Sequence, residues 1–448
     1  MKRTLSLVLA LVMMLGLVFT PSFSVAAEDK PFEGQTLRLA GLDGGYGTDG
    51  WKAVIKGFED MTGATVEATF EKKIYDVIRP EIQAGNAPDI IYNSIGQETG
   101  LTETMIKEEM LLDLTDVLDM QVPGEEKAVK DKLIAGFTDT AMTNPYGDGK
   151  TYLAPLFYSP TGLFYNKALF GKDGKYELPA TMEDFLALGE SAKEDGIALF
   201  TYPTAGYMDS FIPSLLNEVG GPELYSKLMS YDVDAWKEEV TPMFETLGKI
   251  LTYIHPSTVA NANGDAFTQN QLYIMTNEAL FMPNGTWVVD EMSDAKDQAA
   301  EGFEWGFMPL PSMEKDGDRY AFTFFEQAFV SKDTEVPELA KTFIAYLYSD
   351  EATKAFIENK GGVQPILGAE EFLKDEDQKL FYSIYEDGAK AAMGGFQSVE
   401  NSVEGVSVTD ALYQAVDSVA NGELSVEDWQ AGVVDAVQQI ADANSEGE

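Results

Sequence analysis

Residues 36–92 read TLRLAGLDGGYGTDGWKAVIKGFEDMTGATVEATFEKKIYDVIRPEIQAGNAPDIIY. Val54, Ile55, Phe58 and Met61 have the spacing of one helical face, and Gly63 is a typical residue just after a helix end. The pattern predicts strands over 36–41, 65–70 and 88–92, and helices over 51–62 and 74–84. Strands and helices that alternate in this way form βαβ units around a parallel sheet, so the stretch predicts an α/β fold.

Two loops follow strands of this predicted sheet, at Asp43–Gly47 and at Asn93–Glu98. Ligands of parallel sheets bind outside the carboxyl ends of the strands, so we expect a binding site at these loops. The glycines of the first loop match neither of the common phosphate-binding patterns, and no lysine follows them at the helix start. We interpret them as residues that let the chain turn.

Composition excludes several classes of function. The chain has 448 residues and a net charge of −44, which argues against binding to nucleic acid or to an anionic membrane surface. It has no cysteine, which excludes disulfides, thiolate nucleophiles and cysteine-ligated metals. His255 is the single histidine, so no site can use two imidazoles. No cofactor and no metal are expected.

The N-terminus has the pattern of a secretory signal peptide over residues 1–27. Lys2 and Arg3 precede an apolar run from Leu5 to Phe19, and small residues at Ser24–Ala27 suit a signal peptidase. We expect an exported protein, periplasmic or extracellular. The alternative is an uncleaved anchor. No cysteine follows the signal to carry a lipid.

The rest of the chain predicts a second α/β unit. A composition change at Asn144–Gly149 indicates a crossing between two units. Beyond it, the pattern predicts helices over 181–194 and 335–348, two C-terminal helices around 411–419 and 433–440, and strands over 197–201, 279–282 and 303–308.

Motifs for catalysis are few. The run from Asn261 to Asp265 begins like a calcium-binding loop but lacks the later glycine and glutamate that such a loop requires. No Gly-x-Ser-x-Gly motif accompanies His255, which disfavours serine hydrolase chemistry. With 75 acidic residues, a secreted glycosidase that uses two carboxylates remains the alternative function.

Aromatic residues in loops point to a sugar, because a sugar ring has apolar faces and polar edges. The candidate aromatic residues lie beside Gly, Pro, Asn or Thr, and they are Tyr46, Tyr202, Tyr207, Trp287, Phe324, Phe325 and Phe396. We expect Trp287 to cover one face of a pyranose ring, with Tyr202 or Tyr207 on the opposite lobe. The candidate polar residues for the sugar hydroxyls are Asp43, Asn93, Glu98, Asn284 and Glu326.

Five short motifs in order resemble those of the extracellular sugar-binding proteins of ABC importers. They are AGNAPDI at 84–90, YNKALF at 165–170, PATMEDF at 179–185, GTW at 285–287 and LAKTFIAYL at 339–347. The segments 196–202 and 283–292 are similar to those of proteins that bind N-acetylglucosamine and diacetylchitobiose.

The resemblance implies a type II periplasmic-binding-protein-like fold, with a sugar held in a cleft between two α/β lobes. It implies a first lobe of 28–144 plus 279–331 and a second lobe of 145–278 plus 332–448. It further implies a non-enzymatic monomer that closes around a mono- or oligosaccharide by a hinge and delivers the sugar to the permease subunits of a membrane importer.

Overall fold

The structure is a computed structural model, and it describes residues 30–445 except 45, 96–99, 139, 141, 173, 265, 360, 387 and 398–402. The expected signal peptide, residues 1–27, lies outside the described residues. Within the described part, every helix is too short or too polar to cross a bilayer.

The strands and helices alternate along most of the chain. The strands are β1 (Thr36–Leu42), β2 (Thr65–Glu71), β3 (Ile90–Tyr92), β4 (Leu153–Asn166), β5 (Ala198–Phe200), β6 (Ala279–Gly285), β7 (Trp305–Met308), β8 (Tyr320–Val330) and β9 (Lys390–Ala392). The α-helices are α1 (Asp49–Thr62), α2 (Ile74–Gln83), α3 (Leu101–Lys107), α4 (Val129–Lys132), α5 (Met182–Glu194), α6 (Ile212–Met229), α7 (Thr241–Leu251), α8 (Thr258–Ala262), α9 (Phe267–Met275), α10 (Val288–Glu291), α11 (Pro337–Leu347), α12 (Asp350–Glu358), α13 (Glu376–Tyr382), α14 (Val408–Tyr413), α15 (Val416–Ala420) and α16 (Val426–Ser445).

One mixed sheet of nine strands among the described residues organises the molecule, in the order β2-β1-β3-β8-β4-β6-β5. β7 also pairs with β4, and β9 with β8. β1 is parallel to both β2 and β3, as the stretch 36–92 predicts. β5 and β6 form a second parallel pair, and the strands between the two pairs run antiparallel.

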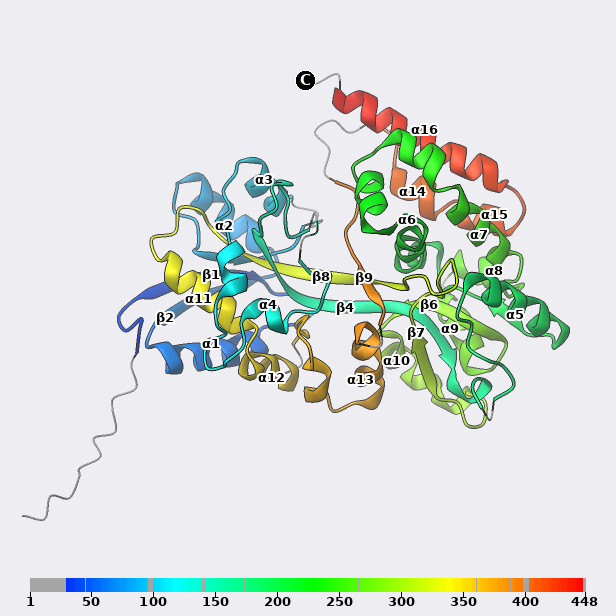
Figure 1. The fold of residues 1–448 in the computed structure, drawn as a ribbon, viewed down its shortest axis with the longest axis horizontal. Helices are drawn as coiled ribbons and strands as arrows, with labels where there is room; N and C mark the ends of the chain where they lie inside the picture. The colour runs from blue at the N-terminus through cyan, green and yellow to red at the C-terminus, as the bar shows by residue number, and fades with distance from the viewer. Residues whose placement is uncertain are drawn as a thin grey trace, which may run out of the picture.

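Two long strands, β4 and β8, run through both halves of the molecule (Figure 1). The first part of β4 pairs with β8, and its last part pairs with β6 and β7. The register of β4 and β8 shifts between Pro155 and Phe157, where proline has no N–H to donate. We call the half around β1–β3 the first lobe and the half around β5–β7 the second lobe.

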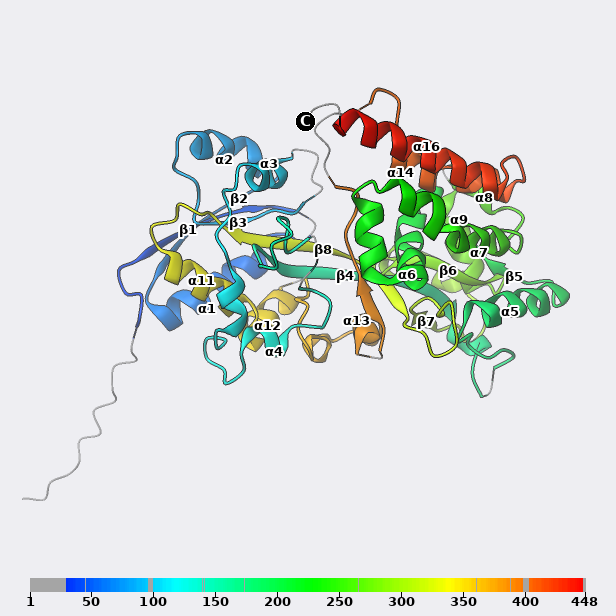
Figure 2. The same cartoon turned by 45° about the horizontal axis from the view of Figure 1, so that its top comes forward.

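The segments that return to each lobe differ from the expected division. β6 pairs with β5 and contacts α9, so residues 279–285 lie in the second lobe and not in the first. α11 and α12 pack on α1, so residues 337–358 lie in the first lobe and not in the second. Figure 2 shows α11 and α12 beside α1, and β6 and β7 among the helices of the other lobe. The resemblance implied where the chain returns to each lobe, but the short motifs behind it do not identify which element each segment packs against.

Each lobe has a core built on large aromatic side chains. In the first lobe, Trp51 of α1 contacts Tyr92 of β3 and Phe356 of α12, with ring centroids 5.0 and 5.2 Å apart. In the second lobe, the indoles of Trp236 and Trp429 are fully buried, and Trp429 meets Phe244 of α7 edge to face. These cores make each lobe a firm support for residues at the boundary between them.

Candidate functional site

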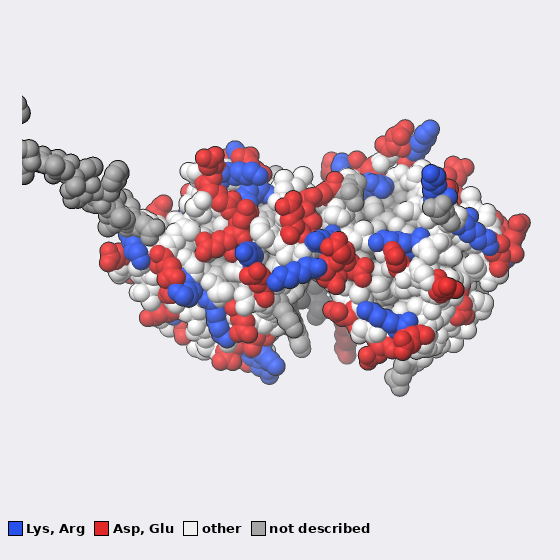
Figure 3. Space-filling view, turned by 90° about the horizontal axis from the view of Figure 1, so that it is seen from below, with Lys and Arg blue, Asp and Glu red and all other residues white. Residues whose placement is uncertain are grey.

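A cavity of about 370 Å³ lies at the boundary between the lobes, and we call it the cleft cavity. Its lining residues come from the loops after β1 and β3, from the segment before β4, from β8 and from the segment after β9. They are Tyr46, Ser94, Ile95, Met142, Phe322, Thr323, Phe324, Phe325, Glu326, Gly394, Gly395 and Phe396. The carboxyl ends of β1 and β3 thus border the cavity, as expected for a parallel sheet. Seen from below, the surface is indented between the two lobes, and acidic and basic side chains are interspersed on both (Figure 3).

Glu326 is the single carboxylate among the described residues that line the cleft cavity. The hydroxyl of Tyr92 donates a hydrogen bond to Glu326 Oε2. No other described residue bonds to this carboxyl group. Burial raises the pKa of Glu326, and the hydrogen bond from Tyr92 acts in the opposite direction. The group is therefore oriented by Tyr92 and can accept a hydrogen bond from a ligand hydroxyl.

Tyr46 brings an aromatic ring to the cavity from the first lobe. Its ring packs against Phe157 of β4, with centroids 5.1 Å apart. Burial raises the pKa of the Tyr46 hydroxyl, and the nearby Tyr382 and Glu326 raise it further. The hydroxyl is consequently a neutral donor at physiological pH.

Three aromatic residues form a cluster on the second-lobe side, and we call Tyr207, Trp287 and Phe324 the aromatic platform. The ring of Trp287 lies 6.4 Å from that of Tyr207 and 6.1 Å from that of Phe324. Trp287 and Phe324 are 37% and 39% exposed, which is unusual for large aromatic side chains. Because Phe324 also lines the cleft cavity, the platform continues that cavity.

Gly285 allows the indole ring of Trp287 to pack against the backbone of the GTW turn. A Cβ at position 285 would overlap the indole ring of Trp287, so only glycine allows the ring to lie across the backbone here. Tyr207 and Trp287 are neighbours on one lobe. The sequence analysis expected Tyr207 on the lobe opposite Trp287, and the structure instead places the two rings side by side.

Three expected site residues have buried side chains in the structure. Tyr202 is 0% exposed, and its hydroxyl donates to Asp417 Oδ1 at 2.6 Å inside the second lobe. Asn93 is 2% exposed, and its Nδ2 donates to Thr102 Oγ1 at 2.8 Å. Asn284 is 0% exposed, and its Oδ1 accepts from the Gly285 N–H at 2.8 Å. These side chains serve the fold at the ends of their strands and do not face the cleft.

Of the remaining expected residues, one lines the cleft cavity, one lies near it and one is not described by the structure. Phe396 lines the cleft cavity, and its ring stacks on Tyr231 and Trp236 at 5.4 and 6.1 Å. Asp43 is half-buried in the loop that also carries Tyr46, but it does not line the cavity. Glu98 lies outside the described residues.

The sequence analysis missed the cavity residues of two separate segments, one before β4 and one after β9. Met142 and the pair Gly394–Gly395 lie in irregular segments without periodicity, so no pattern pointed to them. Ser94 and Ile95 follow β3 directly and fall in the loop that the analysis identified.

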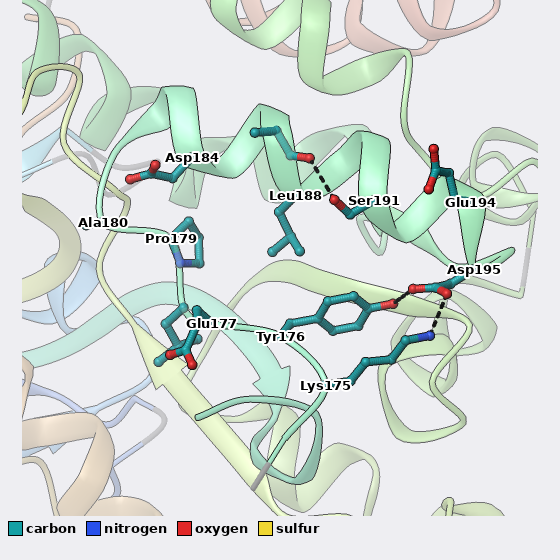
Figure 4. Close-up of a pocket in the computed structure, with 12 residues that line it drawn as sticks. Lys175, Tyr176, Glu177, Pro179, Ala180, Asp184, Leu188, Ser191, Glu194 and Asp195 are labelled. Carbon is teal, nitrogen blue, oxygen red and sulfur yellow. Dashed lines mark hydrogen bonds and ion pairs between the residues drawn. The ribbon is translucent and has the colours of Figure 1, made fainter. Parts of the chain in front are cut away.

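A larger groove of about 670 Å³ lies beside α5 in the second lobe alone (Figure 4). There the hydroxyl of Tyr176 and the ammonium group of Lys175 both contact Asp195, at 2.6 and 2.7 Å. These three polar groups thus bind one another, and the described lining of the groove comes from the second lobe. The groove is therefore a weaker ligand site than the cleft cavity.

Comparison with known proteins agrees with the two-lobed architecture. A bacterial solute receptor whose title gives β-D-galactopyranose as its exclusive substrate superposes with a TM-score of 0.70 at 18% identity, over 92% of this chain and 99% of the receptor. A cyclic α-maltosyl-1,6-maltose binding protein from Arthrobacter globiformis superposes with a TM-score of 0.64 at 16% identity, over 90% and 98% of the two chains. At these identities the likeness concerns the fold.

The names of proteins with similar sequences also include sugars. Diacetylchitobiose binding protein NgcE of Streptomyces coelicolor is 28% identical over 270 residues, 58% of this chain. The match spans 54% of that relative, about half its length. Maltodextrin-binding protein MdxE of Bacillus subtilis is 24% identical over 338 residues, 73% of each chain. The family description "Bacterial extracellular solute-binding protein" matches residues 53–378, and the chain belongs to this family.

Proposed function

We propose that this protein is the substrate-binding component of a carbohydrate ABC importer. The observation that carries the proposal is the cleft between the lobes, where an exposed aromatic platform adjoins an oriented carboxylate. Aromatic rings suit the apolar face of a pyranose, and a carboxylate suits its hydroxyl groups. The protein would be exported by its N-terminal signal and would act as a monomer that delivers its ligand to membrane permease subunits.

The ligand class is a mono- or oligosaccharide. The names of the relatives support this class, since they include binders of diacetylchitobiose, maltodextrin and β-D-galactopyranose. Within the class, sugars of the N-acetylglucosamine and chitobiose type are our first candidates, because the segments 196–202 and 283–292 are similar to those of such binders.

The contacts suggest how the ligand would be held. The pyranose ring would lie on Trp287 and Phe324, while Glu326 accepts a hydrogen bond from a hydroxyl group. Tyr46 would approach from the first lobe. A ligand that touches both lobes binds the closed form more tightly than the open form, and this difference drives closure.

A secreted glycosidase is less compatible with the site. Glycosidases use two carboxyl groups about 5 to 9.5 Å apart. The described lining of the cleft cavity contains Glu326 alone, and the family is one of binding proteins.

A thermal-shift screen tests the proposal, with diacetylchitobiose, maltotriose, galactose and N-acetylglucosamine as probes. We expect at least one sugar to raise the melting temperature while chromatography detects no hydrolysis. Calorimetry on Trp287→Ala should then show a loss of about 2–4 kcal/mol of binding free energy, which is typical of a buried aromatic anchor. Tyr202→Phe is the matched control, and it should leave the affinity unchanged because its hydroxyl lies inside the second lobe.

Two results would contradict the proposal. One is that hydrolysis products accumulate. The other is that none of the sugars changes the melting temperature.

A further inference from the structure

A second cavity of about 610 Å³ adjoins the cleft cavity. The two cavities share three lining residues, Met142, Gly394 and Gly395. The second cavity lies between α6 of the second lobe and residues 135, 136, 138, 140 and 142 of the first lobe, beside β9. Figure 1 shows the chain around β9 rising between α6 and the first lobe. The two cavities are therefore adjacent, with Met142 and the pair Gly394–Gly395 between them.

Three methionines contribute to the lining of the second cavity, and we call it the methionine cavity. Met142, Met229 and Met393 contribute their side chains, together with Tyr225 and Ala391. Methionine side chains are flexible and polarizable, so they adapt to apolar groups of varied shape. At about 610 Å³ the space is within the usual size range of small-molecule sites.

Three of the polar side chains that line the methionine cavity already have protein partners. The hydroxyl of Tyr225 donates to the Gly394 carbonyl at 2.9 Å. The amide Nδ2 of Asn217 donates to the Pro213 carbonyl at 2.9 Å. The ammonium group of Lys390 pairs with Asp318. A sugar hydroxyl buried beside these three groups would lose its hydrogen bonds to water without a free partner in them, which is costly.

We propose that the methionine cavity receives an apolar substituent of the bound sugar, so that the protein prefers glycosides with an apolar aglycone to the free sugars. This inference rests on the proposed function. The polar sugar occupies the cleft cavity at Glu326 and the aromatic platform, and the aglycone passes Met142 into the methionine cavity. The chemical difference between the two cavities thus determines the orientation of the ligand.

Calorimetry on paired glycosides tests the inference. The probes are the methyl and hexyl β-glycosides of N-acetylglucosamine, glucose and galactose. Burial of each additional methylene group favours binding, so we expect a hexyl glycoside to bind at least tenfold more tightly than its methyl counterpart. The methyl glycosides measure binding of the sugar itself.

Variants that fill the methionine cavity test whether the preference for hexyl glycosides arises there. Ser226 is an exposed residue of α6 that lines this cavity, so Ser226→Trp fills space without disturbing the core. Ala135→Phe fills it from the first lobe, also from an exposed position. Each variant should abolish the tenfold preference for hexyl glycosides. Ser191→Trp is the matched control on an exposed position of α5, and it should keep the preference.

The outcomes separate this inference from the proposed function. Equal affinities for methyl and hexyl glycosides overturn the inference and leave the proposed function intact. A hexyl preference that survives in both filled variants also overturns it. So does a protein that binds an oligosaccharide of the thermal-shift screen but none of the six glycosides. A protein that binds no sugar and no glycoside overturns both.

Discussion

The carboxyl group of Glu326 can accept a hydrogen bond from the ligand, but its burial lowers the stability of the folded protein when it is ionised. Burial raises its pKa in the folded protein above the unfolded value of about 4.3, so the folded state binds more protons between these two pKa values. Protonated Glu326 therefore favours the folded state. This contribution to the free energy of unfolding is fully present below the unfolded pKa and is lost as pH rises through the folded pKa. Above the folded pKa, the ionised carboxylate is an unfavourable buried charge.

Glu326→Gln should consequently make the protein more stable and a weaker binder at pH 7. The amide removes the buried charge, and its oxygen can still accept the hydrogen bond from Tyr92. Sugar affinity should fall about tenfold or more, since a hydrogen bond to a charged group contributes about 1.5–3 kcal/mol. Melting temperatures of both proteins between pH 4 and 8 test the first part, and calorimetry tests the second.

The gain in melting temperature should shrink as pH falls toward 4, because Glu326 is then protonated in the unaltered protein too. A gain that is independent of pH would show that the carboxylate is not the cause. Unchanged affinity would remove Glu326 from the site.

The structure brings some of the expected site residues to the cleft cavity and buries others, and the reason is physical. Tyr46, Glu326 and Phe396 line the cleft cavity, whereas Tyr202 has the same local composition but a buried hydroxyl bonded to Asp417. Neighbouring residues in sequence determine whether a ring lies near a strand end. They do not determine whether it points to the cleft or to the core.

Elements with strong periodicity were predicted well, and long buried strands were not. The helix expected over 181–194 is α5, and the strand expected over 65–70 is β2. The stretch expected as one helix around 411–419 is interrupted between α14 and α15. β4 and β8 carry few alternating polar positions because both faces are covered, so their continuity was missed. These two strands join the lobes. The sequence indicated a crossing at Asn144–Gly149, just before β4, but not the long strands that form the connection.

The start of α5 provides a test of an element that was predicted from a motif. Thr181 Oγ1 accepts from the Asp184 N–H, and the Asp184 side chain accepts from the Thr181 N–H, which completes a capping box. Thr181→Ala should lower the free energy of unfolding by about 1 kcal/mol. Thr181→Ser should restore most of it, because serine keeps the hydroxyl. Urea unfolding monitored by circular dichroism measures both variants.

Sugar affinity should be the same in both Thr181 variants, because α5 lies outside the cleft cavity. An alanine variant with unaltered unfolding free energy would show that the cap contributes nothing.

At the scale of the whole molecule, we expect the two lobes to close around the sugar. Tyr46 and Ser94 belong to the first lobe, while Trp287 and Tyr207 belong to the second, so a ligand gains the second set of contacts on closure. The register shift near Pro155 in β4 is where we expect the strands between the lobes to bend. Hinge closure of this kind is a known transition of periplasmic binding proteins.

The free energy of binding limits how complete this closure can be. A change from 1:99 to 99:1 in favour of the closed form needs about 5.5 kcal/mol of differential affinity, and a micromolar ligand provides about 8 kcal/mol in total. Most contacts must therefore form only on closure. Small-angle scattering should show a smaller radius of gyration at a saturating concentration of the sugar that the thermal-shift screen identifies. A sugar that gives no thermal shift is the control and should leave the radius unchanged. An identical radius with and without the bound sugar would contradict closure, and the permease would then have to recognise the loaded protein by the sugar itself.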